Sequence, residues 1–144
     1  MADWSYKLNS DYVKSLPRDV QRTMRNERTI INALIKAAKA RGYFVRALNT
    51  ADEVSPITKQ TNLIEPVLYA CDEAWLHILE PSPDKSGKYR KVCGFYFIYG
   101  NGNEGCDVVS DGSWKETPER NTRDIYEAIE AAGDAAARKC EARI

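Results

Sequence analysis

The sequence predicts a single α+β domain in which an antiparallel sheet of about four strands packs against long N- and C-terminal helices, in the order α-β-α-β-β-β-α. Three observations predict this fold class. Long stretches near both ends place apolar residues at helical spacing. Three runs within residues 74–111 are rich in β-branched and aromatic residues. Only short turns join these runs, which requires neighbouring strands to be antiparallel.

The N-terminal part is predicted to be a tail, residues 1–16, followed by a helix over about 17–41. Pro17 suits the start of a helix and Gly42 suits its end. The tail is rich in aromatic residues, so we expect it to pack on the body of the domain. Its aromatic residues are Trp4, Tyr6 and Tyr12, and the apolar stripe of the helix comprises Val20, Met24, Ile31, Leu34, Ile35 and Ala38.

A short strand over 43–48 and a polar loop over 49–60 follow. Asn62 and Glu65 have the spacing of a helix-start box, which predicts a second, short helix. We expect Asp72 and Glu73 to end this helix. The residues predicted to share its apolar face are Leu63, Ile64, Val67, Leu68 and Cys71.

Strands are predicted over 74–80, 89–99 and 106–111, and the closing helix over about 122–142. In the first of these strands the side-chain period of two places Trp75, His77 and Leu79 on one face, with Leu76 and Ile78 on the other. The residues of the closing helix expected to face inward are Ile125, Ile129, Ala132, Ala136 and Cys140.

The segment GNGNEG at residues 100–105 matches the glycine pattern G-x-G-x-x-G. A dinucleotide site requires a helix directly after such glycines, because the helix N-terminus meets the pyrophosphate. Here the glycines are followed by CDVVSD, a β-rich run. The pattern therefore indicates a hairpin turn, in which glycine supplies positive φ.

The 144 residues are 43% hydrophobic and 29% charged, as in soluble globular proteins. No apolar run approaches the roughly 20 residues that span a bilayer, and no secretion signal opens the chain, so we expect a cytoplasmic protein without a membrane segment. Four widely spaced cysteines then predict reduced, mostly buried thiols.

Net charge is zero, but residues 1–48 carry ten basic and four acidic side chains. An asymmetry of this kind can mark a charged binding face.

The runs GYFV, ITKQTNLIEPVL, CDEAWLHIL, GFYFIYGN and CDVVSD occur in this order over about residues 42–135. In this the chain resembles a group of small phage and prophage proteins with a GW-V-YGN…DVI-D hairpin. Phe95 stands where that pattern has tryptophan, and the turn is longer. The resemblance implies a mobile-element origin and the cytoplasm of an infected or lysogenic bacterium. Because no activity is established for the group, it implies no catalytic residues.

Candidate chemistry is sparse. His77 is the one histidine, so a nucleophilic site could use only this residue, with Cys93 or Cys106 on neighbouring strands as the nucleophile. A half-buried structural histidine is the favoured interpretation. Asp107 and Asp111 would lie about 13 Å apart along one strand face, too far for a glycosidase pair. We expect no catalytic residue, no cofactor and no metal site.

Three sets of residues remain as candidate contact surfaces. They predict a non-enzymatic accessory protein that binds a host or phage protein, and the resemblance suggests inhibition of a host defence complex of restriction or CRISPR type. The alternative function is nucleic-acid binding by the basic first helix. The third candidate function is that of a small enzyme centred on His77. A homodimer is a further candidate assembly. The basic set is Arg18, Arg22, Arg25, Lys36 and Lys39; the acidic set is Asp72, Glu73, Glu104, Asp107 and Asp111; the aromatic set is Trp75, Tyr96, Tyr99 and Trp114.

Overall fold

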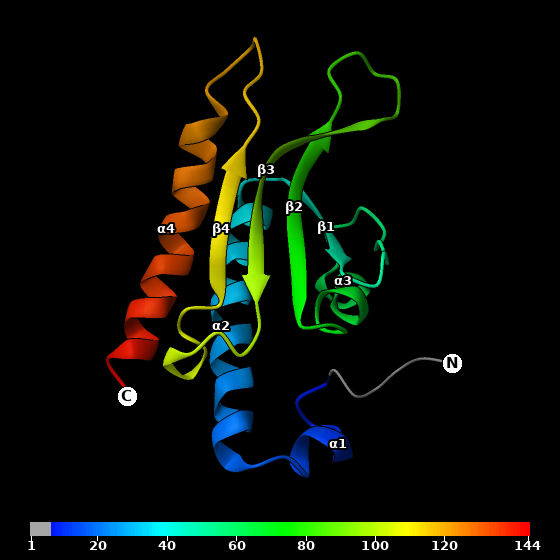
Figure 1. Ribbon diagram of the computed structural model, residues 1–144. Coiled ribbons are helices and arrows are strands. Elements are labelled where there is room, and N and C mark those ends of the chain that lie inside the picture. Colours follow the sequence, from blue (N-terminus) through cyan, green and yellow to red (C-terminus); the bar gives the residue numbers. More distant parts are fainter. Residues whose placement is uncertain (1–6) are drawn as a thin grey trace.

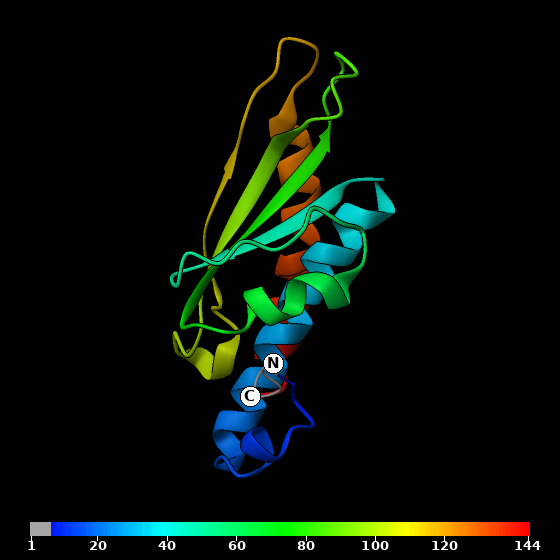
Figure 2. The ribbon, with the colours of Figure 1, turned by 90° about the vertical axis from the view of Figure 1, so that its right-hand side faces the viewer.

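The computed structural model describes residues 7–144. Four antiparallel strands form one sheet in the order β1-β2-β3-β4, and the long helices α2 and α4 both lie on one side of it (Figures 1 and 2). The predicted class and element order are confirmed, with a short helix added at the start. The elements are α1 (Asp11–Lys14), α2 (Arg18–Ala40), β1 (Phe44–Asn49), α3 (Thr61–Leu68), β2 (Glu73–Pro81), β3 (Tyr89–Ile98), the 3₁₀ turn η1 (Asn103–Gly105), β4 (Val109–Trp114) and α4 (Thr122–Glu141).

Helix α2 carries much of the core. Ile31 and Leu34 are buried, and Gly42 ends the helical segment with a φ of 84°, which glycine adopts at little cost. The prediction that Val20 faces the core is wrong, since this side chain is 39% exposed. The first turns of α2 extend beyond the edge of the sheet (Figure 1), so Val20 has no strand to pack against.

The described part of the tail, residues 7–16, packs on the body of the domain. Val13 of α1 is buried, and the Gln21 side chain donates to the Leu16 carbonyl at 2.8 Å. The segment before α2 therefore folds back against the first turn of that helix. Trp4 and Tyr6 lie outside the described residues.

The sheet buries one face and leaves the other uncovered. Leu76 of β2 pairs with Ala47 of β1 and Phe95 of β3, and all three side chains are buried beneath the helices. The neighbouring residue Trp75 pairs with Tyr96 on the opposite face. The predicted alternation is confirmed up to Ile78. Leu79 departs from it and is buried, because the register between β2 and β3 shifts between Ile78 and Leu79.

The predicted start and end of α3 are wrong. The helix begins at Thr61, after Gln60, whose N–H donates to the Thr58 hydroxyl at 2.9 Å. It ends at Leu68, so the expected helical positions of Cys71, Asp72 and Glu73 are also wrong: the Asp72 carbonyl accepts from the Tyr99 N–H, and Glu73 begins β2. Residues that were expected to extend the helix therefore take part in strand pairing instead. Leu63 points outward and is 41% exposed.

The last strand begins three residues later than predicted, at Val109. Asn103 and Glu104 adopt φ values of 51° and 52°, and the resulting 3₁₀ turn packs on α2. Asp107 therefore lies in a turn and does not share a strand face with Asp111.

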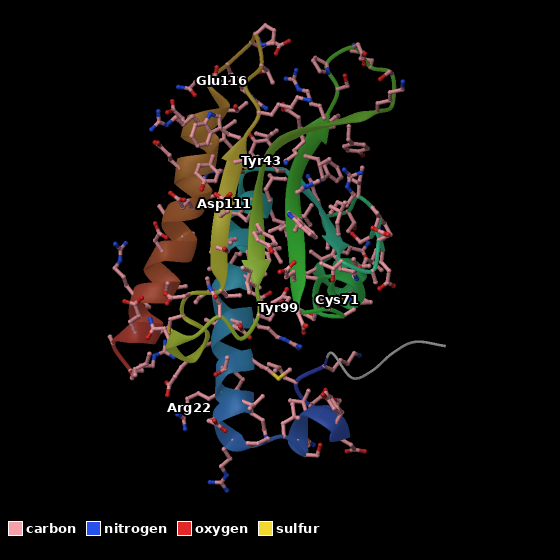
Figure 3. All side chains as sticks on the ribbon, in the orientation of Figure 1. Arg22, Tyr43, Cys71, Tyr99, Asp111 and Glu116 are labelled. Carbon is pink, nitrogen blue, oxygen red and sulfur yellow. A yellow bond between two sulfur atoms is a disulfide. The ribbon has the colours of Figure 1, made fainter. Side chains whose placement is uncertain are left out.

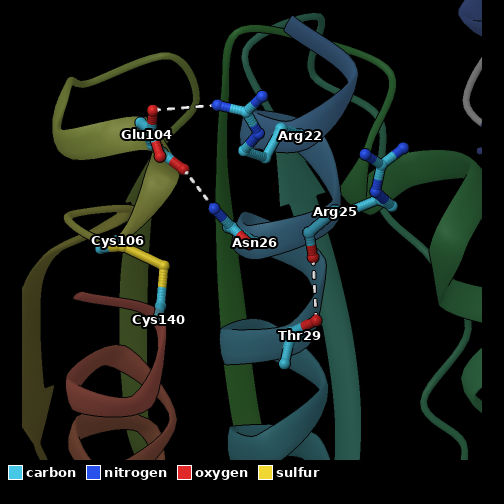
Figure 4. Close-up of a disulfide and its surroundings, with 7 residues drawn as sticks. All are labelled: Arg22, Arg25, Asn26, Thr29, Glu104, Cys106 and Cys140. Carbon is cyan, nitrogen blue, oxygen red and sulfur yellow. Dashed lines mark hydrogen bonds and ion pairs between the residues drawn. A yellow bond between two sulfur atoms is a disulfide. The ribbon is translucent and has the colours of Figure 1, made fainter. Parts of the chain in front are cut away.

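The prediction of four reduced thiols is wrong for Cys106 and Cys140, which form a disulfide (Figure 4). It joins the turn after η1 to the last turn of α4, residues that are 34 positions apart. Such a link stabilises a fold mainly by restricting the unfolded chain. Cys93 is a free buried thiol and Cys71 a free, partly exposed one.

Replacement of Gly105 by alanine is expected to lower the free energy of unfolding by about 2–4 kcal/mol. Its φ is 87°, and an added Cβ would lie 2.5 Å from the Thr23 carbonyl oxygen of α2. Gly87→Ala is the matched control, because Gly87 has a φ of 80° with open space around it, and it should cost only the backbone strain of about 1 kcal/mol. Urea denaturation measures both, and equal losses would contradict the close approach of η1 to α2.

Candidate functional site

The uncovered sheet face carries an aromatic pair beside a small hollow. The rings of Trp75 and Tyr96 stack with centroids 5.1 Å apart, and the adjoining hollow has a volume of about 250 Å³. Gly94 lines the hollow, and a Cβ at this position would lie only 3.0 Å from Lys91 Cε. The residues around the hollow include Trp75, His77, Lys91, Tyr96, Asp111 and Ser113.

Two cations on this face, Arg46 and Lys91, form no ion pair within residues 7–144. Arg46 approaches the His77 ring, with Nη2 3.4 Å from Nδ1, and its buried Nε lacks a hydrogen-bond partner within residues 7–144. Neither Arg46 nor Lys91 forms an ion pair among these residues, although Asp111 lines the same hollow. A buried or half-buried cation is stabilised by an acceptor, so this face favours a ligand that supplies carboxylates or phosphates.

His77 is held neutral by these surroundings. Burial lowers its pKa to about 4, and the positive charges of Lys91 and Arg46 act in the same direction. The nucleophiles considered for it are unsuitable: Cys93 projects from the opposite face of the sheet and burial raises the pKa of its thiol, while Cys106 is oxidised. The structure therefore does not bring His77 together with a cysteine nucleophile.

The five basic residues of α2 do not act as one free row. Arg22 pairs with Glu104 at 3.2 Å, and Asn26 donates to the Glu104 carbonyl at 2.9 Å (Figure 4). Lys39 contacts the Thr61 hydroxyl at 3.3 Å. Arg18, Arg25 and Lys36 are exposed and form no ion pair within the described chain.

The predicted acidic residues also divide among different environments. Glu104 is paired with the basic helix, and Asp107 is exposed in the turn after η1. Asp111 lies on the outer side of β4 (Figure 3), opposite Tyr96. Asp72 and Glu73 lie at the start of β2, where Glu73 is beside the Tyr96 hydroxyl. No group of three or more His, Cys, Asp or Glu side chains in residues 7–144 could hold a metal ion.

The aromatic residues are likewise not one surface. Trp75 and Tyr96 form the outer pair, but Tyr99 lies past the end of β3 and donates from its hydroxyl to the Leu68 carbonyl at 2.6 Å. Trp114 packs against Tyr126 of α4, with ring centroids 5.2 Å apart. Only the outer pair adjoins the uncompensated cations.

The sequence patterns did not predict that two charged residues of α2 are buried. Glu27 and Arg28 of α2 are 3% and 9% exposed. A signal was present, because Glu27 follows Met24 by three residues and precedes Ile31 by four, which places a carboxylate within the apolar stripe. Burial raises the pKa of Glu27 to about 6, and the Gly100 N–H, which donates to Glu27 Oε2 at 2.7 Å, opposes that shift.

Comparison of the chain with protein families, with curated proteins and with solved structures finds no match. None of the helices within residues 7–144 has the length and apolar composition needed to cross a membrane.

The single histidine allows a direct test of the outer face. Because the folded-state pKa of His77 lies below its usual value of 6.5, protonation opposes folding, and stability should fall as pH decreases from 6.5 towards 4. NMR titration of the imidazole should give a midpoint near pH 4, and Lys91→Gln should move it upward. Lys139→Gln, on α4, is the control and should leave the midpoint of the His77 titration unchanged. A wild-type midpoint near 6.5 would contradict the described surroundings.

Proposed function

We propose that the protein is a phage or prophage accessory protein that acts without catalysis, by binding a host or phage protein through the uncovered face of its sheet. The observation that carries the proposal is the Trp75–Tyr96 stack beside Arg46 and Lys91, two cations with no ion pair in the described chain. Aromatic side chains and arginine are the residue types that anchor protein interfaces. A partner that offers carboxylates opposite these cations would complete their interactions.

The biological role we propose is inhibition of a host defence complex of the restriction or CRISPR type. An inhibitor of such a complex can act by occupying a charged surface that the complex needs for its own contacts. This part rests on the resemblance to phage and prophage proteins. The proposed partner surface is acidic, because the outer face presents Arg46 and Lys91.

Nucleic-acid binding by α2 is the second candidate. Arg18, Arg25 and Lys36 are exposed cations on one helix, and none of them is ion-paired within residues 7–144. Backbone phosphates would be the contacted groups, so affinity would fall steeply with salt. The ion pair of Arg22 with Glu104 reduces the charge available on this helix.

Capture of partners from bacterial lysate, with and without added nuclease, tests the two candidates together. Lys91→Glu and Trp75→Ala are expected to weaken the captured protein complex at least about tenfold, because they remove a cation and an anchor at the proposed interface. Lys139→Glu is the matched charge reversal on exposed α4 and should retain binding. Arg25→Glu is the corresponding charge reversal on the basic helix α2 and tests the nucleic-acid candidate.

The pattern across variants decides between the candidates. Loss with Lys91→Glu and retention with Arg25→Glu supports the sheet face. Retention with both outer-face variants, or capture that requires intact nucleic acid and is lost with Arg25→Glu, overturns the protein-binding proposal in favour of α2. Sedimentation of the purified chain shows whether a second copy occupies the face instead.

A further inference from the structure

A second site lies at the lower end of the sheet, away from the uncovered face. A cavity of about 410 Å³ opens between α2, the segment after α3 and the end of β3, and Figure 3 places Cys71 and Tyr99 at this end. Its polar wall includes Glu27, Arg28 and Tyr69, and its apolar wall includes Tyr12 and Met24. The proposed protein interface uses none of these residues.

Arg28 is a buried cation with unused donors. It is 9% exposed, and the central carbon of its guanidinium lies over the Tyr69 ring, 4.1 Å from the ring centroid. Arg28 forms neither an ion pair nor a hydrogen bond within residues 7–144. An arginine stacked on an aromatic ring keeps its N–H edges available for a planar anion.

Tyr69 supplies a second unused group. Its hydroxyl is buried and has no hydrogen-bond partner among the described residues. The neighbouring Tyr99 hydroxyl is already committed to the Leu68 carbonyl. Buried polar groups are ordinarily hydrogen-bonded, and one without a partner calls for an explanation such as a missing ligand. Arg28 and Tyr69 both line this cavity, so they place a guanidinium and an unpaired hydroxyl at the same wall.

The acids at the cavity restrict the charge of this acceptor. Glu27 lies beside Arg28, with one carboxylate oxygen bound by the Gly100 N–H, and Asp72 lines the rim. These two carboxylates oppose a dianion more strongly than a monoanion. The apolar wall formed by Tyr12 and Met24 favours an organic group next to the charge.

We infer that this cavity binds a small organic carboxylate, whose oxygens accept hydrogen bonds from Arg28 and the Tyr69 hydroxyl while its apolar body packs against Met24 and Tyr12. Glu27 limits the affinity by repulsion. The site gives the protein a small-molecule ligand in addition to its proposed protein partner. Neither conclusion depends on the other.

Sodium benzoate is the probe, and benzamide and inorganic phosphate are the comparisons. With the full ¹⁵N-labelled chain, benzoate should shift the amide signals of Gly100 and Cys71 with a dissociation constant on the order of 1 mM, as for other fragment-sized ligands. Benzamide has the same ring without the charge and should bind at least about tenfold more weakly. Phosphate should also bind more weakly, because Glu27 and Asp72 oppose its second charge.

Three variants test the assigned roles while their amide spectra report folding. Tyr69→Phe removes only the unpaired hydroxyl and should weaken benzoate binding about three- to tenfold. Arg28→Gln should abolish binding. Glu27→Gln keeps an oxygen for the Gly100 N–H but removes the charge, and it should strengthen binding several-fold, a gain that a damaged fold would not produce.

Absence of amide shifts with benzoate, equal affinity for benzamide, or tighter binding of phosphate overturns the inference. So does a Glu27→Gln variant that folds and binds benzoate more weakly than the wild type. Loss of protein capture with unchanged benzoate binding would instead reject the proposed function alone.

Discussion

The burial of the sheet on one side only is the constraint from which the other features follow. Leu76, Phe95 and Ala47 fill the space beneath α2 and α4, and the two helices approach closely because Gly133 of α4 leaves room for the Leu34 side chain. With both long helices on this side, no helix within residues 7–144 lies over the opposite face (Figure 2). The residues there do not pack against a helix, and they include stacked aromatic rings and half-buried cations.

The same arrangement accounts for the cavity at the end of the sheet. Helix α2 is longer than the strands it covers, so its first turns pass the sheet edge (Figure 1). There the buried side of the helix meets the turns after α3 and β3, and its stripe changes from aliphatic residues to Glu27 and Arg28. A carboxylate and a guanidinium placed where a leucine would stabilise the fold weaken the core.

The sequence was sufficient for what depends on local periodicity and insufficient for what depends on distant contacts. Helical spacing located α2 and α4, and the period of two separated Trp75 and His77 from Leu76. The stack of Trp75 on Tyr96 required the register between strands, which no local pattern determines. The start of β4 was misplaced because contacts with α2 hold Glu104 in a positive-φ turn. The Cys106–Cys140 pair and the cavity likewise arise from residues that are far apart in the chain.

Site-specific photo-crosslinking in bacteria tests most directly whether the uncovered face is the functional surface. A benzophenone amino acid would replace Ser113, which is exposed beside the hollow, and in a separate protein Asp134, which is exposed on α4. We predict a discrete crosslinked protein band from position 113 and none from position 134, because contact requires the outer sheet face. A band from position 134 alone would contradict this account and assign binding to the helical side.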